Sequence, residues 1–480
     1  MVRARRVAAG IVLVLLASGC TPGDPAPASA PSASVSVPES PRAFAPGAAG
    51  IGDPYFPAYG NGGYDVAGYD LKLRYDPKSG QLRGSATITA TATQDLSSFH
   101  LDLAHLTVSK VTVEARPATS RAQGAELIVT PAAGLPQGTA FTTVIEYGGK
   151  PAPLENKALG VGGWLRTADG GFALGQPESA STWFPVNDHP ADKAKFSLAI
   201  EVPDGVEAIS NGVPGPRSSK GGWTTWTWSE GAPMASYLAT VVIGQFRVTT
   251  GTHDGKPSVV AIPESLPAKG AAARSLARTG EIADFLAGYF GPYPFDAYGG
   301  VVLDDKRVGY ALETQSRPVY GNTFFTRGVD YPVVVHELAH QWYGDSVALK
   351  RWEDIWLNEG FATYAEWLWS EHERGPTAQQ TFDRLYARWS WANPTGDPGA
   401  DRIFGPAVYQ RGAMVVHALR KKIGDKAFFG LLKSWPTAHR DGNVTTDEFI
   451  AAAEQASGKD LGDFFQAWLY GKTKPQLSSG

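Results

Sequence analysis

Residues 336–345 read HELAHQWYGD, and within this stretch His336 and His340 are four residues apart. Side chains at that spacing leave the same face of an α-helix, so both imidazoles can bind one metal ion. Glu337 occupies the next radial position, from which its carboxylate can reach a water molecule on the metal. The stretch therefore predicts a helix that carries a zinc site.

Flanking residues also favour a helix at this place. Asp330 can cap its N-terminus, Pro332 suits its first turn and Gly344 can end it. Val333–Val335 favour a strand instead, because they are β-branched. We expect a helix here, since the capping residues agree with the spacing of the histidines.

A second motif, WLNEG (356–360), supplies a third candidate ligand. Glu359 follows His340 after eighteen intervening residues and lies at the start of a second predicted helix, 355–374. Two histidines and one carboxylate leave the fourth position of a tetrahedral zinc ion open, which is the arrangement of catalytic sites. We therefore predict one Zn²⁺ per chain, bound by His336, His340 and Glu359.

Two further residues of the second predicted helix could support these ligands. Thr363 and Glu366 lie on the same helical face as Glu359. Polar groups behind metal ligands orient them and tune the metal. For Glu366, a side chain that simply points into solvent is an equal alternative.

These motifs resemble those of the M1 zinc aminopeptidases of the gluzincin group, and the similarity extends over most of residues 55–475. VYQRGA (408–413) resembles the catalytic-tyrosine motif of that family. The resemblance implies that Glu337 is the general base for zinc-bound water and that Tyr409 stabilises the oxyanion. A phenol suits this task, because it stays neutral and donates a hydrogen bond at pH 7.

The resemblance also implies two glutamates that bind the free α-amine of the substrate. GYALETQ (309–315) resembles the family's GxMEN segment, and Glu313 stands at its glutamate. GQPES (175–179) resembles the segment that supplies a second acidic contact, through Glu178. Two carboxylates around one ammonium favour peptides with a free N-terminus, because internal peptide bonds would leave those buried charges unpaired.

The remaining sequence predicts an α+β chain with two folded domains. From Tyr69 to Val248, short alternating runs separated by turn residues predict an antiparallel β sandwich or saddle. Later segments such as 269–290 and 445–457 read as helices. We expect a β domain at 51–249, and the resemblance implies a thermolysin-like, mainly helical metallopeptidase domain at 250–477.

Residues 463–477 resemble the end of the family's catalytic domain. Larger members continue into a C-terminal helical domain that helps to close the substrate cavity, so the resemblance implies a short form with a more open cleft. No residue of this chain is nominated for the carboxylate of the substrate.

The first twenty residues predict export. Three arginines precede an apolar run, Val7–Ala17, and the following residues end in a lipobox-like Cys20. We expect a lipoprotein signal peptide at 1–20 and a lipid on Cys20, which would anchor the protein at the outer face of the bacterial cytoplasmic membrane. An ordinary secretory signal is the alternative. Residues 21–50 are rich in Pro, Ala, Ser and Gly and predict a disordered linker.

Composition excludes several kinds of chemistry and partner. The 480 residues include 43 basic and 47 acidic side chains, so no basic excess is present to bind nucleic acid. The single cysteine, Cys20, rules out an internal disulfide and a thiolate zinc site. The resemblance implies peptides with a free N-terminus as partners, and the lipid on Cys20 would add a membrane; the sequence contains no indication of oligomeric state.

Two alternative functions stay open. Tyr310, Leu312 and Thr314 depart from the family's GxMEN segment, which is consistent with a zinc endopeptidase whose recognition of the N-terminus is relaxed. A catalytically silent surface protein that binds peptides is the other alternative.

Overall fold

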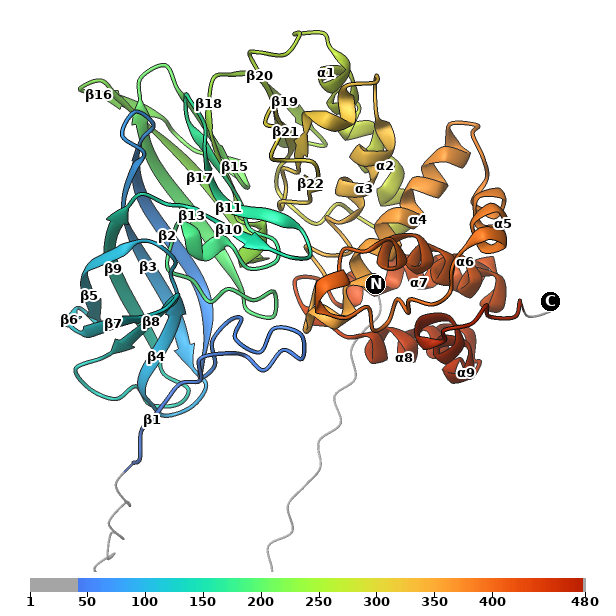
Figure 1. Ribbon diagram of the computed structural model, residues 1–480, viewed down its shortest axis with the longest axis horizontal. Helices are drawn as coiled ribbons and strands as arrows, with labels where there is room; N and C mark the ends of the chain where they lie inside the picture. Colours follow the sequence, from blue (N-terminus) through green and yellow to red (C-terminus); the bar gives the residue numbers. More distant parts are fainter. Residues whose placement is uncertain (1–41, 478–480) are drawn as a thin grey trace, which may run out of the picture. The chain divides into compact units, whose positions relative to one another are not determined.

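In the computed structural model, which describes residues 42–477, strands dominate up to Pro263 and helices dominate from Ala271 onward (Figure 1). This order confirms the predicted β-rich part followed by a mainly helical part. The predicted signal peptide, Cys20 and most of the predicted linker lie outside the described residues. Within residues 42–477, no helix is long and apolar enough to span a bilayer.

The largest sheet follows from strict alternation along its strands. In β2, Leu71, Leu73 and Tyr75 are buried whereas Lys72 and Arg74 are exposed, so one face packs on the core. The strand order is β15-β17-β13-β2-β3-β9-β5-β6, with β16 paired to β17. The strands are β2 (Tyr64–Asp76), β3 (Gln81–Ala92), β5 (Thr107–Val113), β6 (Arg116–Pro117), β9 (Ala140–Gly149), β13 (Lys193–Pro203), β15 (Val213–Pro214), β16 (Ser218–Lys220) and β17 (Trp223–Ala235).

One central pair of this sheet departs from the predicted antiparallel architecture. Strands β13 and β2 run parallel, with Leu198 opposite Leu71. Parallel neighbours need a long connection, and residues 77–192 supply it. Alternation along a strand does not encode the direction of its neighbour, so the sequence pattern did not predict this pair.

Two smaller sheets complete the β-rich part, with the orders β1-β4-β8-β7 and β10-β11-β12-β18-β14. Their strands are β1 (Ala45–Pro46), β4 (Leu96–Asp102), β7 (Thr119–Gln123), β8 (Glu126–Thr130), β10 (Pro153–Asn156), β11 (Gly160–Arg166), β12 (Gly171–Leu174), β14 (Glu207–Ser210) and β18 (Val241–Gly244). Strand β1 falls inside the predicted disordered linker and differs from that prediction. It is ordered by main-chain pairing, since Ala45 lies opposite Leu96 and the amide of Gly47 donates to the carbonyl of Ser98 at 2.8 Å.

A five-stranded sheet with the order β19-β20-β21-β23-β22 begins the second part. Its strands are β19 (Phe246–His253), β20 (Lys256–Pro263), β21 (Tyr298–Leu303), β22 (Ala311–Leu312) and β23 (Val319–Gly321). The predicted domain boundary between residues 249 and 250 therefore falls inside β19. The run YLATVVIGQFRV (237–248) reads as one strand-like segment although β18 ends at Gly244 and β19 begins at Phe246, so the pattern did not reveal that β19 joins another sheet.

The helices that follow are α1 (Ala271–Leu276), α2 (Thr279–Phe290), α3 (Tyr331–Ala339), α4 (Trp356–His372), α5 (Ala378–Arg388), α6 (Gly412–Ile423), α7 (Asp425–Ala438), α8 (Thr446–Ser457) and α9 (Gly462–Phe465). A π-helical turn, Ala407–Arg411, leads directly into α6. Two short strands of this part, β24 (Ala348–Leu349) and β25 (Asn443–Val444), pair with each other in parallel.

Helix α3 forms as predicted, although it is shorter than expected. The carboxylate of Asp330 accepts a hydrogen bond from the amide of Val333 at 3.2 Å and caps the helix. The three valines, Val333–Val335, are buried, so packing outweighs their strand propensity. The helix ends at Ala339, five residues before Gly344.

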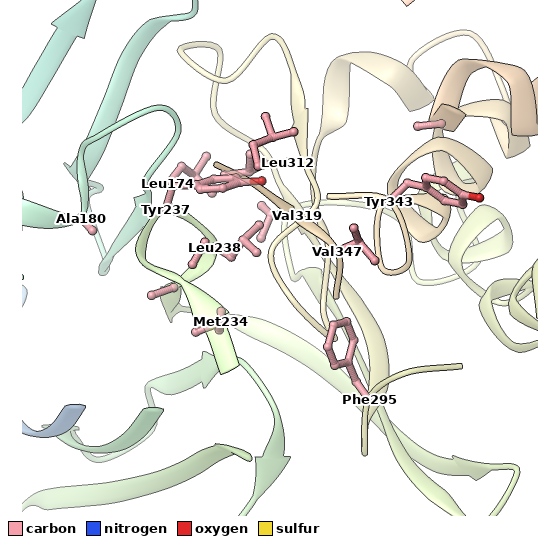
Figure 2. Close-up of a cluster of buried hydrophobic side chains, with 14 of the residues drawn as sticks. Leu174, Ala180, Met234, Tyr237, Leu238, Phe295, Leu312, Val319, Tyr343 and Val347 are labelled. Atoms are coloured by element: carbon pink, nitrogen blue, oxygen red, sulfur yellow. The ribbon is translucent and has the colours of Figure 1, made fainter. Parts of the chain in front are cut away.

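An apolar cluster joins the β-rich part to the five-stranded sheet. Figure 2 shows Leu174, Tyr237 and Leu238 together with Leu312 and Val319, and each of these side chains is at most 1% exposed. Full burial of an apolar side chain contributes about 1.5–3 kcal/mol. The cluster therefore fixes β22 against the β-rich part, and with it Glu313, the residue that follows β22.

Helices α4 and α6 approach each other through two glycines. A Cβ atom on Gly360 would lie 2.9 Å from the carbonyl carbon of Gly412, and one on Gly412 would lie 2.9 Å from the Cα atom of Gly360. Neither position has room for a side chain. This close contact brings the π-helical turn next to the start of α4.

Candidate metal centre

Three side chains from two helices converge at one point. His336 belongs to α3, His340 follows the last residue of α3, and Glu359 lies in the first turn of α4. The Nε2 atoms of His336 and His340 lie 3.2 and 3.3 Å from Oε2 of Glu359. These three ligand atoms all lie within 4.8 Å of one another, and the side chains are buried. The structure thus brings together the three predicted ligands.

The outer nitrogen of each ring has its own partner. Nδ1 of His336 lies 2.7 Å from Oε1 of Glu366, and Nδ1 of His340 lies 3.0 Å from the carbonyl oxygen of Tyr343. A neutral imidazole that donates from Nδ1 keeps its lone pair on Nε2, which is the form that binds zinc. The donor set therefore fits a zinc ion.

Of the two residues that the sequence placed behind the ligands, only Glu366 contacts a ligand. The sequence alone is equally consistent with a Glu366 side chain that points into solvent. The contact between Glu366 and Nδ1 of His336 decides in favour of the supporting role. Thr363 is buried on the same helix, but its hydroxyl oxygen has no hydrogen-bond partner among the described residues.

Negative charge is concentrated around the two histidines. Burial raises the pKa of Glu359, but both rings outweigh that effect and lower it to about 2. Burial lowers the pKa of His340, but Glu359 and Glu313 raise it to about 9. Burial raises the pKa of Glu337 to about 8, against the opposing effect of the two histidines. Buried carboxylates that raise the pKa of a buried histidine create an environment that favours a cation.

A cavity of about 360 Å³ opens onto these residues and is also lined by Glu313, Glu337 and Tyr409. Tyr409 lies in the π-helical turn, and its ring stacks on His336 with 5.9 Å between the ring centroids. Burial and the nearby carboxylates raise the pKa of Tyr409, so its phenol stays neutral and able to donate. Glu337, the predicted general base, and Tyr409 therefore line the same cavity.

Glu313 follows β22 and is held by the β-rich part. Its Oε1 accepts hydrogen bonds from the hydroxyl of Tyr237 at 2.9 Å and from Nε2 of Gln176 at 3.2 Å. The carboxylates of Glu313 and Glu337 and one ring nitrogen of His340 lie within 4.8 Å of one another. The sequence reasoning missed Gln176 and Tyr237, although Gln176 belongs to the GQPES segment that it singled out.

Glu178 occupies a different environment from Glu313. Among the described residues that line the cavity, Gln176 is present and Glu178 is not. Oε2 of Glu178 accepts a hydrogen bond from Nδ2 of Asn156 at 3.5 Å, and the side chain is partly exposed. The structure therefore does not bring Glu178 into the cavity wall with Glu313.

A buried pair of histidines and a glutamate on two helices, with a second glutamate beside them, is the site of a zinc metallopeptidase. The model of the Peptidase M1 N-terminal domain matches residues 66–238, and that of the Peptidase family M1 domain matches residues 276–468. The chain belongs to peptidase family M1.

Solved structures and curated relatives agree with this assignment. An M1 zinc metallopeptidase from Deinococcus radiodurans is 31% identical, with a TM-score of 0.82 over 89% of this chain and 98% of that chain. A variant from the same organism, bound to a Tyr-Ser-Ala substrate, is 29% identical, with a TM-score of 0.82 over 89% and 99% of the two chains. Aminopeptidase M1 of Arabidopsis thaliana is 26% identical over 86% of this chain and 50% of its own length. The chain thus spans about half the length of this relative.

Proposed function

We propose that the protein is a zinc-dependent aminopeptidase that hydrolyses N-terminal residues from peptides. One observation carries the proposal: the buried carboxylate of Glu313 shares a cavity with Glu337 and the candidate zinc ligands. A substrate amine bound by Glu313 would bring only the first peptide bond to the metal. Cleavage restricted to the first peptide bond distinguishes an aminopeptidase from an endopeptidase.

The roles of the residues follow from their positions. Zinc, held by His336, His340 and Glu359, would supply Lewis-acid chemistry at the carbonyl and water oxygens. Glu337 takes the proton of the attacking water on its carboxylate and then delivers it to the leaving amine. The hydroxyl of Tyr409 donates a hydrogen bond to the developing oxyanion.

Recognition of the amine rests on Glu313, with Glu178 assigned as the second acidic contact at the edge of the same site. Gln176 lies two residues before Glu178 and lines the cavity, which supports this assignment. An N-acetylated peptide would have no cation for the buried carboxylate of Glu313, so binding it would leave that charge unpaired.

Free and blocked substrates test the proposal. The zinc-loaded protein should hydrolyse an aminoacyl anilide and should not hydrolyse its N-acetylated form. Equal cleavage of both would indicate the endopeptidase, with which the changed residues Tyr310, Leu312 and Thr314 are consistent. No cleavage of either by the zinc-loaded protein would indicate a silent peptide-binding protein.

Substrate length provides a second criterion. Among the described residues that line the cavity, none is a lysine or an arginine, so no cation is present there to bind the carboxylate of a short peptide. We expect peptides longer than two residues to be accepted. A strict limit to dipeptides would contradict this expectation.

We also propose that the protein is exported and that Cys20 carries a lipid. The arginines, apolar run and lipobox-like end of residues 1–20 support this. Labelled fatty acid should be incorporated into the wild-type precursor and not into a Cys20→Ala variant. A protein that is released without label would be secreted instead.

A further inference from the structure

The segment just before the β-rich core folds into a closed loop that reaches Glu178, the second acidic contact of the proposed amine site. Its ends meet, because the amide of Gly62 donates to the carbonyl of Ala48 at 2.9 Å. Within it, the amide of Ile51 donates to the carbonyl of Tyr59 at 3.2 Å. We call residues 48–62 the N-terminal loop. It precedes residue 66, where the match to the family's N-terminal domain begins.

Buried polar contacts hold the N-terminal loop in one conformation. The carboxylate of Asp53 accepts from the amide of Trp352 at 2.8 Å and pairs with Nε2 of His189 at 3.1 Å. Gly60 has a φ of +64°, and a Cβ atom there would lie 2.6 Å from Cβ of His189. At the end of the loop, the amide of Asn61 donates to the side chain of Asn187 at 2.6 Å.

The loop presents Tyr59 to the carboxylate of Glu178. The ring of Tyr59 stacks on Phe56 with 4.4 Å between centroids and 2° between planes. Nδ2 of Asn156 lies 3.5 Å from both the hydroxyl of Tyr59 and Oε2 of Glu178, so one amide is within hydrogen-bonding reach of both oxygens. Burial raises the pKa of both groups; the negative charge of Glu178 raises that of Tyr59 further, whereas the phenol opposes the rise at Glu178.

Both donors to Glu178 are neutral. Burial raises the pKa of Tyr59, so the phenol keeps its proton and can only donate to the carboxylate. The amide of Asn156 carries no charge. A lysine or arginine at either position would cancel the negative charge that attracts an ammonium, whereas neutral donors orient the carboxylate and leave its charge available. Fixing a glutamate side chain in advance also removes part of the entropy cost of binding.

We propose that Tyr59 is a positioning residue of the amine site, which holds the carboxylate of Glu178 toward the N-terminal ammonium of the substrate. This inference rests on the proposed function. It assigns part of substrate recognition to the N-terminal loop, outside both stretches that match the family models.

The test compares two tyrosines of the same loop. The hydroxyl of Tyr59 meets Glu178, whereas that of Tyr55 donates to Asp397 at 2.5 Å. Tyr59→Phe keeps the ring that stacks on Phe56 and removes only the hydroxyl. For an aminoacyl anilide we expect KM to rise about tenfold with kcat within about twofold, as for loss of a hydrogen bond to a charged group. Tyr55→Phe should leave KM unchanged, and both variants should melt at the wild-type temperature.

A double-mutant cycle shows whether Tyr59 acts through Glu178. Glu178→Gln should raise KM by itself, and adding Tyr59→Phe to it should cause no further increase. An unchanged KM in Tyr59→Phe, an equal rise in Tyr55→Phe, or multiplying effects in the cycle would each overturn the inference. A wild-type protein that fails to cleave the anilide would overturn the proposed function instead.

Discussion

Oε1 of Glu366 lies 2.7 Å from Nδ1 of His336, while Nε2 of the same ring faces Oε2 of Glu359 at 3.2 Å. One imidazole therefore connects two carboxylates of helix α4, which are seven residues apart. The inner carboxylate can share a metal with the ring, and the outer one fixes the orientation and tautomer of the ring.

Glu366→Gln should weaken zinc binding and leave the fold intact. Loss of such an outer contact costs about 10–100-fold in metal affinity. Competition with a chromogenic chelator measures this change. Thr363→Val is the matched control on the same helix, because its hydroxyl has no hydrogen-bond partner among residues 42–477 and the substitution keeps the shape. Equal affinities of the Glu366→Gln variant and the wild type would refute the role of Glu366.

Glu337→Gln should retain zinc and lose nearly all hydrolysis. The amide keeps the size of the side chain but cannot accept the proton of water, and general acid–base catalysis contributes about 10²–10⁴-fold. Metal analysis and turnover of an aminoacyl anilide should be measured on the same preparation. Wild-type turnover in this variant would sink the assignment of the base.

Tyr409→Phe should lower kcat with little change in KM. Phenylalanine preserves the ring that stacks on His336 and removes the donor to the oxyanion, a loss of about 10²-fold. Steady-state kinetics separate the two parameters. A change confined to KM would make Tyr409 a substrate-binding residue.

Gly412→Ala should destabilise the contact between α4 and α6. The new methyl group would lie 2.9 Å from Cα of Gly360, and such overpacking costs about 1–3 kcal/mol. Gly430→Ala in α7 is the control, because nothing lies within 4 Å of its new methyl group. Alanine is the better helix former, so the control should be neutral or stabilising by up to about 1 kcal/mol. Urea unfolding distinguishes the two variants, and equal stabilities would contradict the close contact.

His417 should make the protein less stable in mild acid. Burial lowers the pKa of His417 to about 4, and Arg420 and Lys421 act in the same direction. Its ring fits the neutral form, since Nδ1 lies 3.3 Å from the hydroxyl of Tyr364 and Nε2 lies 3.1 Å from Oε1 of Gln379.

The unfolded chain binds a proton at this histidine below a pH of about 6.5, whereas the folded chain does so only near pH 4. The free energy of unfolding should therefore fall as the pH drops through this window, by at most about 1.4 kcal/mol per pH unit from this residue. Urea midpoints at pH 7 and pH 5 measure the loss. In His417→Gln the difference between the two midpoints should shrink, and an unchanged difference would assign the effect to other groups.

Local spacing was sufficient to predict the convergence of His336, His340 and Glu359, because two of them share a helical turn and the third begins the next predicted helix. The capping of α3 by Asp330 was equally local. These features depend on residues within a few turns of one another, where helix geometry alone determines which side chains meet.

The surroundings of Glu313 could not be predicted in this way. Gln176 precedes Glu313 by 137 residues and Tyr237 precedes it by 76, so no periodicity relates them. The reach of Tyr59 to Glu178 and the parallel pairing of β2 with β13 also depend on the packing of distant segments. Strand β19 shows the same limit, because its local sequence does not indicate which of two sheets it joins.

The cluster in Figure 2 joins two stretches of the chain that contribute different residues to the candidate site. Every residue assigned to bond cleavage lies between residues 331 and 411, whereas Gln176, Glu178 and Tyr237 precede the five-stranded sheet. In the proposed mechanism, the groups that act on the peptide bond therefore lie in one stretch of the chain, and the residues that support amine recognition by Glu313 lie in an earlier one. If the proposed function is correct, substitutions in the earlier stretch should alter recognition of the substrate N-terminus and leave the groups that act on the bond unchanged.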